Sequence, residues 1–150
     1  MEILEYFSCN NKEYWLNEIK KSDWRGGTIL ASFIEEEKFF KLRGEGGKIL
    51  LLTDGNNLVS FCIYAPRDEI INTTLTPWMG FVYTFPKYRG HHYMQYLFDE
   101  VNKLAKQDGF KEFFISTDHV GLYEKYGCIY KETIHDVDGK ICRLYIYKVK

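Results

Sequence analysis

Apolar residues recur along the chain at two spacings, and these spacings separate the predicted helices from the predicted strands. Within residues 11–22, Trp15, Leu16 and Ile19 lie at helical spacing and lysines follow near the end, which indicates a first helix. Residues 28–44 repeat the helical pattern and end in a basic turn followed by glycine. They predict a second helix, either continuous or broken.

The most regular helical periodicity in the chain begins at Tyr93 and stops at Gly109. We therefore predict a long helix between these two residues. Residues 119–127 indicate a shorter helical turn that is closed by a glycine. The apolar positions of the long helix are Met94, Leu97, Phe98, Val101, Leu104 and Ala105.

Short apolar runs bounded by turn-forming residues indicate β-strands. Residues 54–57 (Asp-Gly-Asn-Asn) and 136–139 (Asp-Val-Asp-Gly) each separate two such runs, which predicts two hairpins. Gly80 lies inside another run, and a glycine within a strand often marks a bulge or the close approach of another group. The predicted strands cover residues 49–53, 58–65, 78–85, 112–117, 128–134 and 141–149, and residues 1–7 are a candidate for one more.

The order of these elements predicts the α/β (α+β) fold class, with a single mixed, mostly antiparallel central sheet flanked by helices. A strand, the long helix and a further strand imply one parallel crossover, whereas the hairpins imply antiparallel pairs. The length of 150 residues is that of one ordinary domain, and the sequence shows no repeat or linker. We therefore expect residues 1–150 to form one domain.

The composition narrows the class of protein. Hydrophobic residues make up 45% of the chain, charged residues 27%, and the formal net charge is −1, which is typical of a soluble globular protein and disfavours nucleic-acid binding. The N-terminal stretch is acidic where a signal peptide needs basic residues, and no apolar run has membrane-spanning length. We expect a cytoplasmic protein without membrane segments. The four cysteines form no Cys-x-x-Cys pair, which favours buried free thiols.

The segment from Phe85 to Tyr93 joins a predicted strand directly to the long helix. Such a junction leaves unpaired backbone N–H groups around one small volume, where the helix dipole favours anions. Arg89 adds a planar cation suited to phosphate. His91 and His92 are adjacent, which disfavours a metal site because neighbouring helix residues do not share a face. A general base and two ordinary helix-start residues both stay open as interpretations of the histidines.

Two segments resemble motifs of one known family. Pro86-Lys87-Tyr88-Arg89-Gly90 is similar to the acyl-CoA-binding loop of the GCN5-related N-acetyltransferase (GNAT) superfamily. His92 and Met94 stand where that motif carries two small residues, and glycine there lets the backbone come close to a pyrophosphate. Gly121-Leu122-Tyr123-Glu124-Lys125-Tyr126-Gly127 resembles the superfamily's Leu-Tyr-x-x-x-Gly-Phe segment, with Cys128 replacing the phenylalanine.

The resemblance implies a metal-free N-acetyltransferase that transfers the acetyl group of its cosubstrate acetyl-CoA to a primary amine of a small molecule or peptide by direct attack. In this interpretation the catalytic residue is Tyr123, which protonates the leaving thiolate. The strand edge pairs with pantetheine, amides at the helix start hold the pyrophosphate, and Ser116 takes the place of an asparagine that contacts pantetheine. The implied cofactor-binding residues are Val82, Tyr83, Thr84, Arg89, Gly90, His91, His92, Tyr93, Met94 and Ser116.

The sequence leaves the acceptor and the general base open. Tyr123 also fits a plain apolar helix face, and we expect Cys128 to be a core thiol because no neighbour in sequence lowers its pKa. The candidates for the base are Asp68, Glu69, Asp118, His119, the run Glu35 to Glu37, and a water relay that leaves no motif.

Two other functions stay open at the sequence level. The departures from the family motifs at His92, Met94 and Ser116 keep a catalytically silent acyl-CoA-binding or regulatory module as an alternative. RNA binding through the tyrosine-rich tail is disfavoured by the near-neutral charge. An edge strand of the C-terminal hairpin gives a possible homodimer contact.

Overall fold

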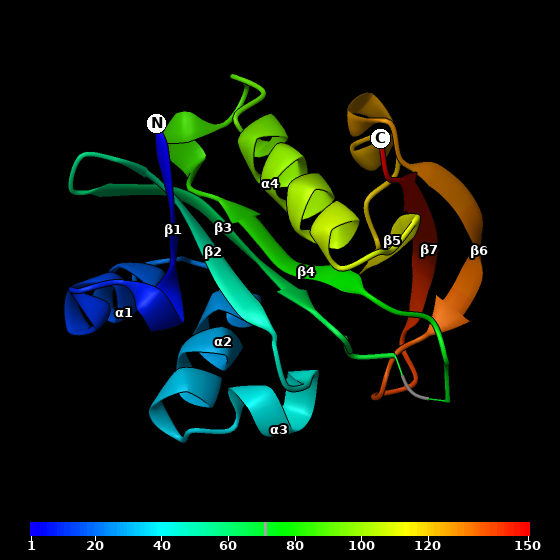
Figure 1. Cartoon of the computed structure of the whole chain (residues 1–150), viewed down its shortest axis with the longest axis horizontal. Helices are drawn as coiled ribbons and strands as arrows, with labels where there is room; N and C mark the ends of the chain where they lie inside the picture. Colours follow the sequence, from blue (N-terminus) through cyan, green and yellow to red (C-terminus); the bar gives the residue numbers. More distant parts are fainter. Residues whose placement is uncertain (71) are drawn as a thin grey trace.

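The computed structural model describes residues 1–70 and 72–150, and a seven-stranded sheet forms its centre (Figure 1). The strand order is β1-β2-β3-β4-β5-β7-β6, and every neighbouring pair is antiparallel except β4 with β5. This confirms the predicted mixed, mostly antiparallel sheet with a parallel crossover through the long helix. The strands are β1 (Glu2–Glu5), β2 (Lys48–Asp54), β3 (Asn57–Ala65), β4 (Trp78–Thr84), β5 (Glu112–Thr117), β6 (Ile129–His135) and β7 (Ile141–Lys148).

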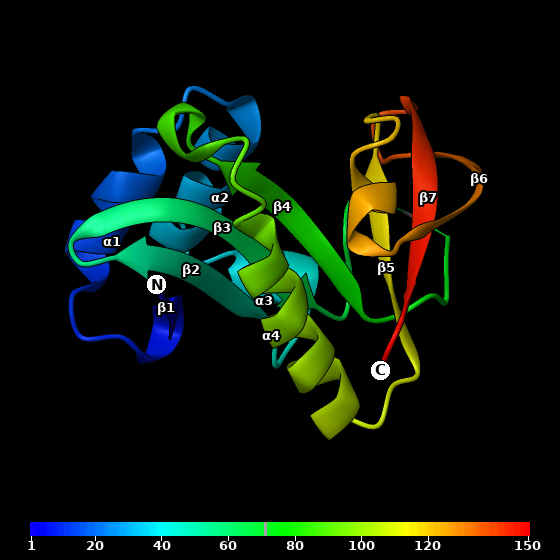
Figure 2. The same cartoon turned by 90° about the horizontal axis from the view of Figure 1, so that it is seen from above.

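Helices cover both faces of the sheet (Figures 1 and 2). Along β2, Leu50 and Leu52 pack on the side of α4, whereas Ile49 and Leu51 pack on the side of α1 to α3. Because both faces are buried, the strand appears in the sequence as an uninterrupted apolar run. None of the described helices is long and apolar enough to cross a membrane. The α-helices are α1 (Lys12–Lys20), α2 (Arg25–Glu35), α3 (Phe39–Arg43) and α4 (Met94–Gln107).

The predicted helices are confirmed with two changes of detail. The second helix is broken into α2 and α3, and Glu37 between them has a φ of +55°, which a continuing helix does not allow. The predicted turn at residues 119–127 is the 3-10 helix η3 (Tyr123–Tyr126), which Gly127 ends with a φ of +91°. Two further 3-10 helices are η1 (Tyr6–Ser8) and η2 (Pro86–Tyr88).

A bulge interrupts β4 beside Gly80, as the glycine within the strand predicts. Gly80 pairs with Ile63 of β3 and Tyr83 pairs with Phe61, so two residues of β4, Phe81 and Val82, lie opposite one residue of β3. The positive φ of the bulge, +47°, falls on Phe81 rather than on the glycine. Such a conformation is rare for a bulky residue and is found mostly at functional sites.

The strands β4 and β5 separate soon after they begin. In the described part of the chain they pair only at Trp78 and Phe114, and Figure 2 shows them diverging towards their carboxyl ends. Trp78, Phe114 and Leu144 of β7 form a small apolar cluster, against which Ile70 and Leu75 of the β3–β4 connection pack. The sheet therefore opens at the side on which α4 starts.

Candidate active site

The edge of β4 that faces the opening is available for a ligand. The carbonyl of Tyr83 accepts the Ser60 hydroxyl at 2.7 Å, and the Phe85 amide donates to the Val59 carbonyl at 3.0 Å, so both backbone groups point towards β3. Because backbone groups alternate along a strand, those of Val82 and Thr84 point towards the opening. Of the three β4 residues predicted to bind the cofactor, Val82 and Thr84 thus direct backbone groups towards the opening, where the Thr84 carbonyl accepts a hydrogen bond from Nε of Arg89.

Tyr83 instead faces the helices on the other side of the sheet. Its ring stacks on Trp24, with 5.4 Å between the ring centres and 7° between the planes, and its hydroxyl donates to Asp23. The Tyr83 side chain therefore points away from the opening and does not face a ligand there.

The turn between β4 and α4 presents a cluster of backbone amides. Within the described residues, the amides of Gly90, His91, His92, Tyr93 and Met94 donate to no other group of the protein. Gly90 and His92 have φ values of +83° and +61°. Successive amides at the start of a helix form a favourable site for a phosphate group, as the sequence predicts.

Side chains around this turn leave room in front of the amides. Met94 is 7% exposed and belongs to the core under α4, so its side chain points away from the turn. The imidazole of His92 stacks on Tyr126 at 4.3 Å, and Tyr126 stacks on Phe98 at 5.1 Å. The two departures from the family motif thus place their side chains in packing contacts.

Arg89 holds the turn against β4 while keeping part of its guanidinium exposed. Its Nε donates to the Thr84 carbonyl at 2.8 Å, and its guanidinium carbon lies 5.4 Å from the centre of the Tyr83 ring. The two terminal nitrogens have no acceptor among the described residues. Arg89 is therefore both a brace for the turn and a candidate phosphate ligand.

Tyr123 is placed at the inner end of the opening. Its side chain is 4% exposed and packs against Phe98 and Tyr145, with 6.2 Å and 5.9 Å between the ring centres. Burial raises the pKa of the phenol well above its usual value, and a hydrogen bond with the Thr117 side chain opposes part of the rise. The phenol therefore stays protonated at neutral pH, as a proton donor must.

A buried carboxylate that the sequence offered only as one of several candidates lies between β4 and β5. Asp68 comes from the β3–β4 connection, and its Oδ2 accepts the Ser116 hydroxyl of β5 at 3.0 Å. Its Oδ1 lies 3.9 Å from Nε of Arg43. The pKa of Asp68 is raised on balance, because burial outweighs the opposing effects of Arg43 and of the hydrogen bond from Ser116.

The neighbours of Asp68 explain why its position is hard to find in the sequence. A Cβ added to Gly80 would stand 2.8 Å from Oδ1 of Asp68, so only glycine leaves room for the carboxylate against β4. Arg43 is 9% exposed, and its guanidinium carbon lies 5.2 Å and 5.3 Å from the ring centres of Phe33 and Phe81. Arg43 carried no signal of function in the sequence.

The other side chains considered as bases lie at the surface. Glu69 and His119 are exposed. Asp118 pairs with Lys140 at 3.3 Å, and both side chains are about two thirds exposed. The run Glu35 to Glu37 is exposed at the end of α2, where Glu35 pairs with Lys20 at 2.8 Å.

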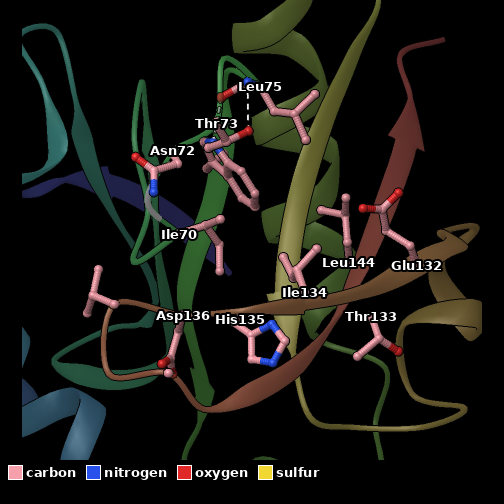
Figure 3. A pocket seen from close by; sticks show the side chains of 13 residues that line it. Ile70, Asn72, Thr73, Leu75, Glu132, Thr133, Ile134, His135, Asp136 and Leu144 are labelled. Carbon is pink, nitrogen blue, oxygen red and sulfur yellow. Dashed lines mark hydrogen bonds between the residues drawn. The ribbon is translucent and has the colours of Figure 1, made fainter.

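Two neighbouring cavities flank the β3–β4 connection. The first, of about 620 Å³, lies between this connection and β6 with β7, and Figure 3 shows Ile70, Leu75, Ile134 and Leu144 on its walls. The second, of about 550 Å³, is lined by Arg43 and Asp68 together with residues of the connection. A small molecule can therefore approach Asp68 from the side of α3.

The cysteines and histidines give no sign of other chemistry. Burial, with a contribution from Glu124, raises the pKa of the Cys128 thiol to about 12, which keeps it in the unreactive thiol form. All four cysteines are free. Among residues 1–70 and 72–150 there is no group of three or more His, Cys, Asp or Glu placed to hold a metal ion.

The comparison with models of known protein families identifies one family. The sequence model of the acetyltransferase (GNAT) family matches residues 12–128. No curated protein sequence matches the chain.

Solved structures of low sequence identity share the whole fold. A GNAT-family protein from Desulfovibrio desulfuricans has a TM-score of 0.71 at 13% identity, over 99% of each chain. An aminoglycoside 6'-N-acetyltransferase complexed with coenzyme A has a TM-score of 0.70 at 12% identity, over 100% of this chain and 98% of that one. A ribosomal-protein-alanine N-acetyltransferase from Brucella melitensis has a TM-score of 0.63 at 10% identity, over 99% of each chain.

Proposed function

The chain belongs to the acetyltransferase (GNAT) family, and we propose that it is an N-acetyltransferase that transfers the acetyl group of acetyl-CoA to a primary amine of a small molecule or peptide. The observation that carries the proposal is the opening between β4 and β5 beside five amides at the start of α4 that have no acceptor among residues 1–70 and 72–150. A pyrophosphate suits the amides, and an amide-containing arm suits the free edge of β4. We also propose that residues 1–150 act as one acetyltransferase domain.

The residues at the opening supply what direct transfer requires. As the amine nitrogen bonds to the acetyl carbon, the carbon–sulfur bond breaks and the sulfur takes the electron pair together with the phenol proton of Tyr123. An acceptor that arrives as an ammonium ion gives one proton to solvent before its lone pair can attack. After the attack the nitrogen releases a second proton, from which the tyrosine is restored through solvent. The bulge at Phe81 and Val82 leaves a backbone group outside the ladder, which can donate to the oxyanion.

The direct test is calorimetric titration of the protein with acetyl-CoA, with dephospho-CoA and ATP for comparison. We expect binding at one site, weakened in Arg89→Ala because this variant loses a phosphate ligand and the brace to the Thr84 carbonyl. Lys87→Ala is the matched control, because Lys87 lies in the same turn but rests over the Tyr88 ring at 5.0 Å. Absence of acetyl-CoA binding by the wild-type protein would contradict the proposal.

A catalytically silent acyl-CoA-binding or regulatory module is the second candidate function. It is favoured by Ser116, whose hydroxyl donates to Asp68 rather than pointing freely towards a ligand. Binding of acetyl-CoA without release of free thiol across a broad amine panel would support the module. Thiol release that depends on an amine would support the enzyme.

A further inference from the structure

The position of Asp68 is fixed by three parts of the fold that meet at the opening. The β3–β4 connection supplies the residue, Ser116 of β5 donates to Oδ2 at 3.0 Å, and Gly80 of β4 leaves the space that Oδ1 occupies. The carboxylate therefore lies where β4 and β5 begin to separate. The negative charge of Asp68 makes a small contribution to the raised pKa of the Tyr123 phenol, after burial and the thiols Cys128 and Cys62.

The charge of Asp68 is buried with incomplete compensation. Its side chain is 7% exposed, and the distance of 3.9 Å to Nε of Arg43 is too long for a hydrogen bond. The buried Nε of Arg43 has no hydrogen-bond partner among the described residues. A carboxylate can accept about four hydrogen bonds, and among the described residues Asp68 receives them from Ser116 and the Glu69 backbone, so it retains capacity for a further donor.

A ligand can reach this carboxylate without passing through the proposed acetyl-CoA site. Asp68 and Arg43 line the cavity of about 550 Å³ that opens towards α3 and the β3–β4 connection. The amides at the start of α4 are not among the residues that line this cavity. Two approaches, one through the opening between β4 and β5 and one through this cavity, thus meet near Asp68.

We propose that Asp68 receives the amino group of the acceptor, holding it as an ammonium ion beside the thioester. This inference rests on the proposed function, which supplies the thioester. An ammonium group brings the donors that the carboxylate lacks and the positive charge that offsets its burial. The exposed carboxylates Asp118 and Glu35 already have lysine partners and lie outside the opening.

The test uses thioethers of CoA, so that no natural acceptor has to be known. S-(3-aminopropyl)-CoA carries an ammonium group just beyond the sulfur, and S-propyl-CoA is its uncharged counterpart. Calorimetry measures the affinity of both for the wild-type protein, for Asp68→Asn, and for Asp118→Asn as the matched control with an exposed carboxylate. A charge-assisted hydrogen bond predicts that the wild type binds the amino compound about tenfold more tightly or better.

We expect Asp68→Asn to lose this preference while binding S-propyl-CoA as the wild type does, and Asp118→Asn to keep it. Equal affinity of the wild type for the two thioethers, or a preference that survives in Asp68→Asn, would overturn the inference and leave acyl-CoA binding intact. Binding of neither compound by the wild type would overturn the proposed function and this inference together.

Thermal unfolding checks that the Asp68→Asn protein is folded. If the Asp68→Asn protein is unfolded, the two thioethers are titrated into Gly80→Ala instead. The added Cβ of this variant displaces the Asp68 carboxylate without removing its charge. The expected result is again a reduced preference for the amino compound, and an unchanged preference in a folded Gly80→Ala protein would count against the role of Asp68.

Discussion

Removing the positive charge of Arg43 should destabilise the fold far more than removing it together with the charge of Asp68. The side chains are 11% and 7% exposed, and Nε of Arg43 lies 3.9 Å from Oδ1 of Asp68. With an effective dielectric constant of about 20, two unit charges at this distance attract each other by about 4 kcal/mol. Loss of one partner of a buried pair typically costs about 3–5 kcal/mol, whereas neutral replacement of both is often harmless.

The assay is urea unfolding of Arg43→Met, Asp68→Asn and the double variant, which together form a double-mutant cycle. We expect a loss of about 3 kcal/mol or more in Arg43→Met and recovery of most of it in the double variant. The exposed pair Lys20 and Glu35 gives the matched cycle, where we expect a coupling below about 1 kcal/mol. Equal, small couplings in both cycles would refute the reasoning, because they would mean that water screens the Arg43 pair.

The pH dependence of the stability of Arg43→Met gives an independent check on the direction in which Arg43 shifts the pKa of Asp68. Burial raises the pKa of Asp68 in the folded protein, and Arg43 opposes that rise. Without Arg43 the folded state binds a proton at higher pH than the unfolded state does, so stability falls as pH rises through this window. The destabilisation of Arg43→Met relative to wild type should therefore be larger at pH 8 than at pH 5.

Three further predictions concern the ligand sites. Tyr123→Phe should bind acetyl-CoA normally in calorimetry but release thiol at least about 100-fold more slowly with any amine that the wild type accepts, and an unchanged rate would exclude the phenol as the acid. His92→Gly should bind acetyl-CoA more tightly, because glycine adopts the φ of +61° freely and so forms the amide turn without backbone strain. Weaker binding by this variant would show that the His92 ring itself contacts the ligand. Polycationic aminoglycosides should be poor acceptors in a thiol-release assay, since the cavity beside Asp68 also carries Arg43 and Arg67, and efficient acetylation of one would contradict this.

The hydrophobic pattern predicted the sheet because strands that are buried on both faces consist almost entirely of apolar residues. Ile49 to Leu52 alternate between two cores, and their uninterrupted apolar run reports this directly. The amides at the start of α4 were equally predictable, because a strand that leads into a helix start places them by local geometry alone. Glycine at position 80 also predicted the bulge.

The acceptor side of the site could not be predicted in the same way, because its contacts join residues far apart in the sequence. Ser116 and Asp68 are 48 positions apart and meet only through the crossover of β4, α4 and β5. Arg43 seemed to be a basic residue ending a helix, yet the rings of Phe33 and Phe81 bury it. Gly80 had a second role that no pattern shows, which is to make room for a carboxylate.

The early separation of β4 from β5 has a mechanical consequence. Within the described chain, the four strands on one side of the sheet and the three on the other share one paired position, Trp78 with Phe114. A ligand lying along β4 would act as a missing strand that joins the two halves. Hydrogen–deuterium exchange should accordingly be fast at the free edge of β4 in the unliganded protein and slow down when the seam is filled. The cosubstrate would then be a structural member of the sheet during the reaction, and its departure would loosen the protein along that seam.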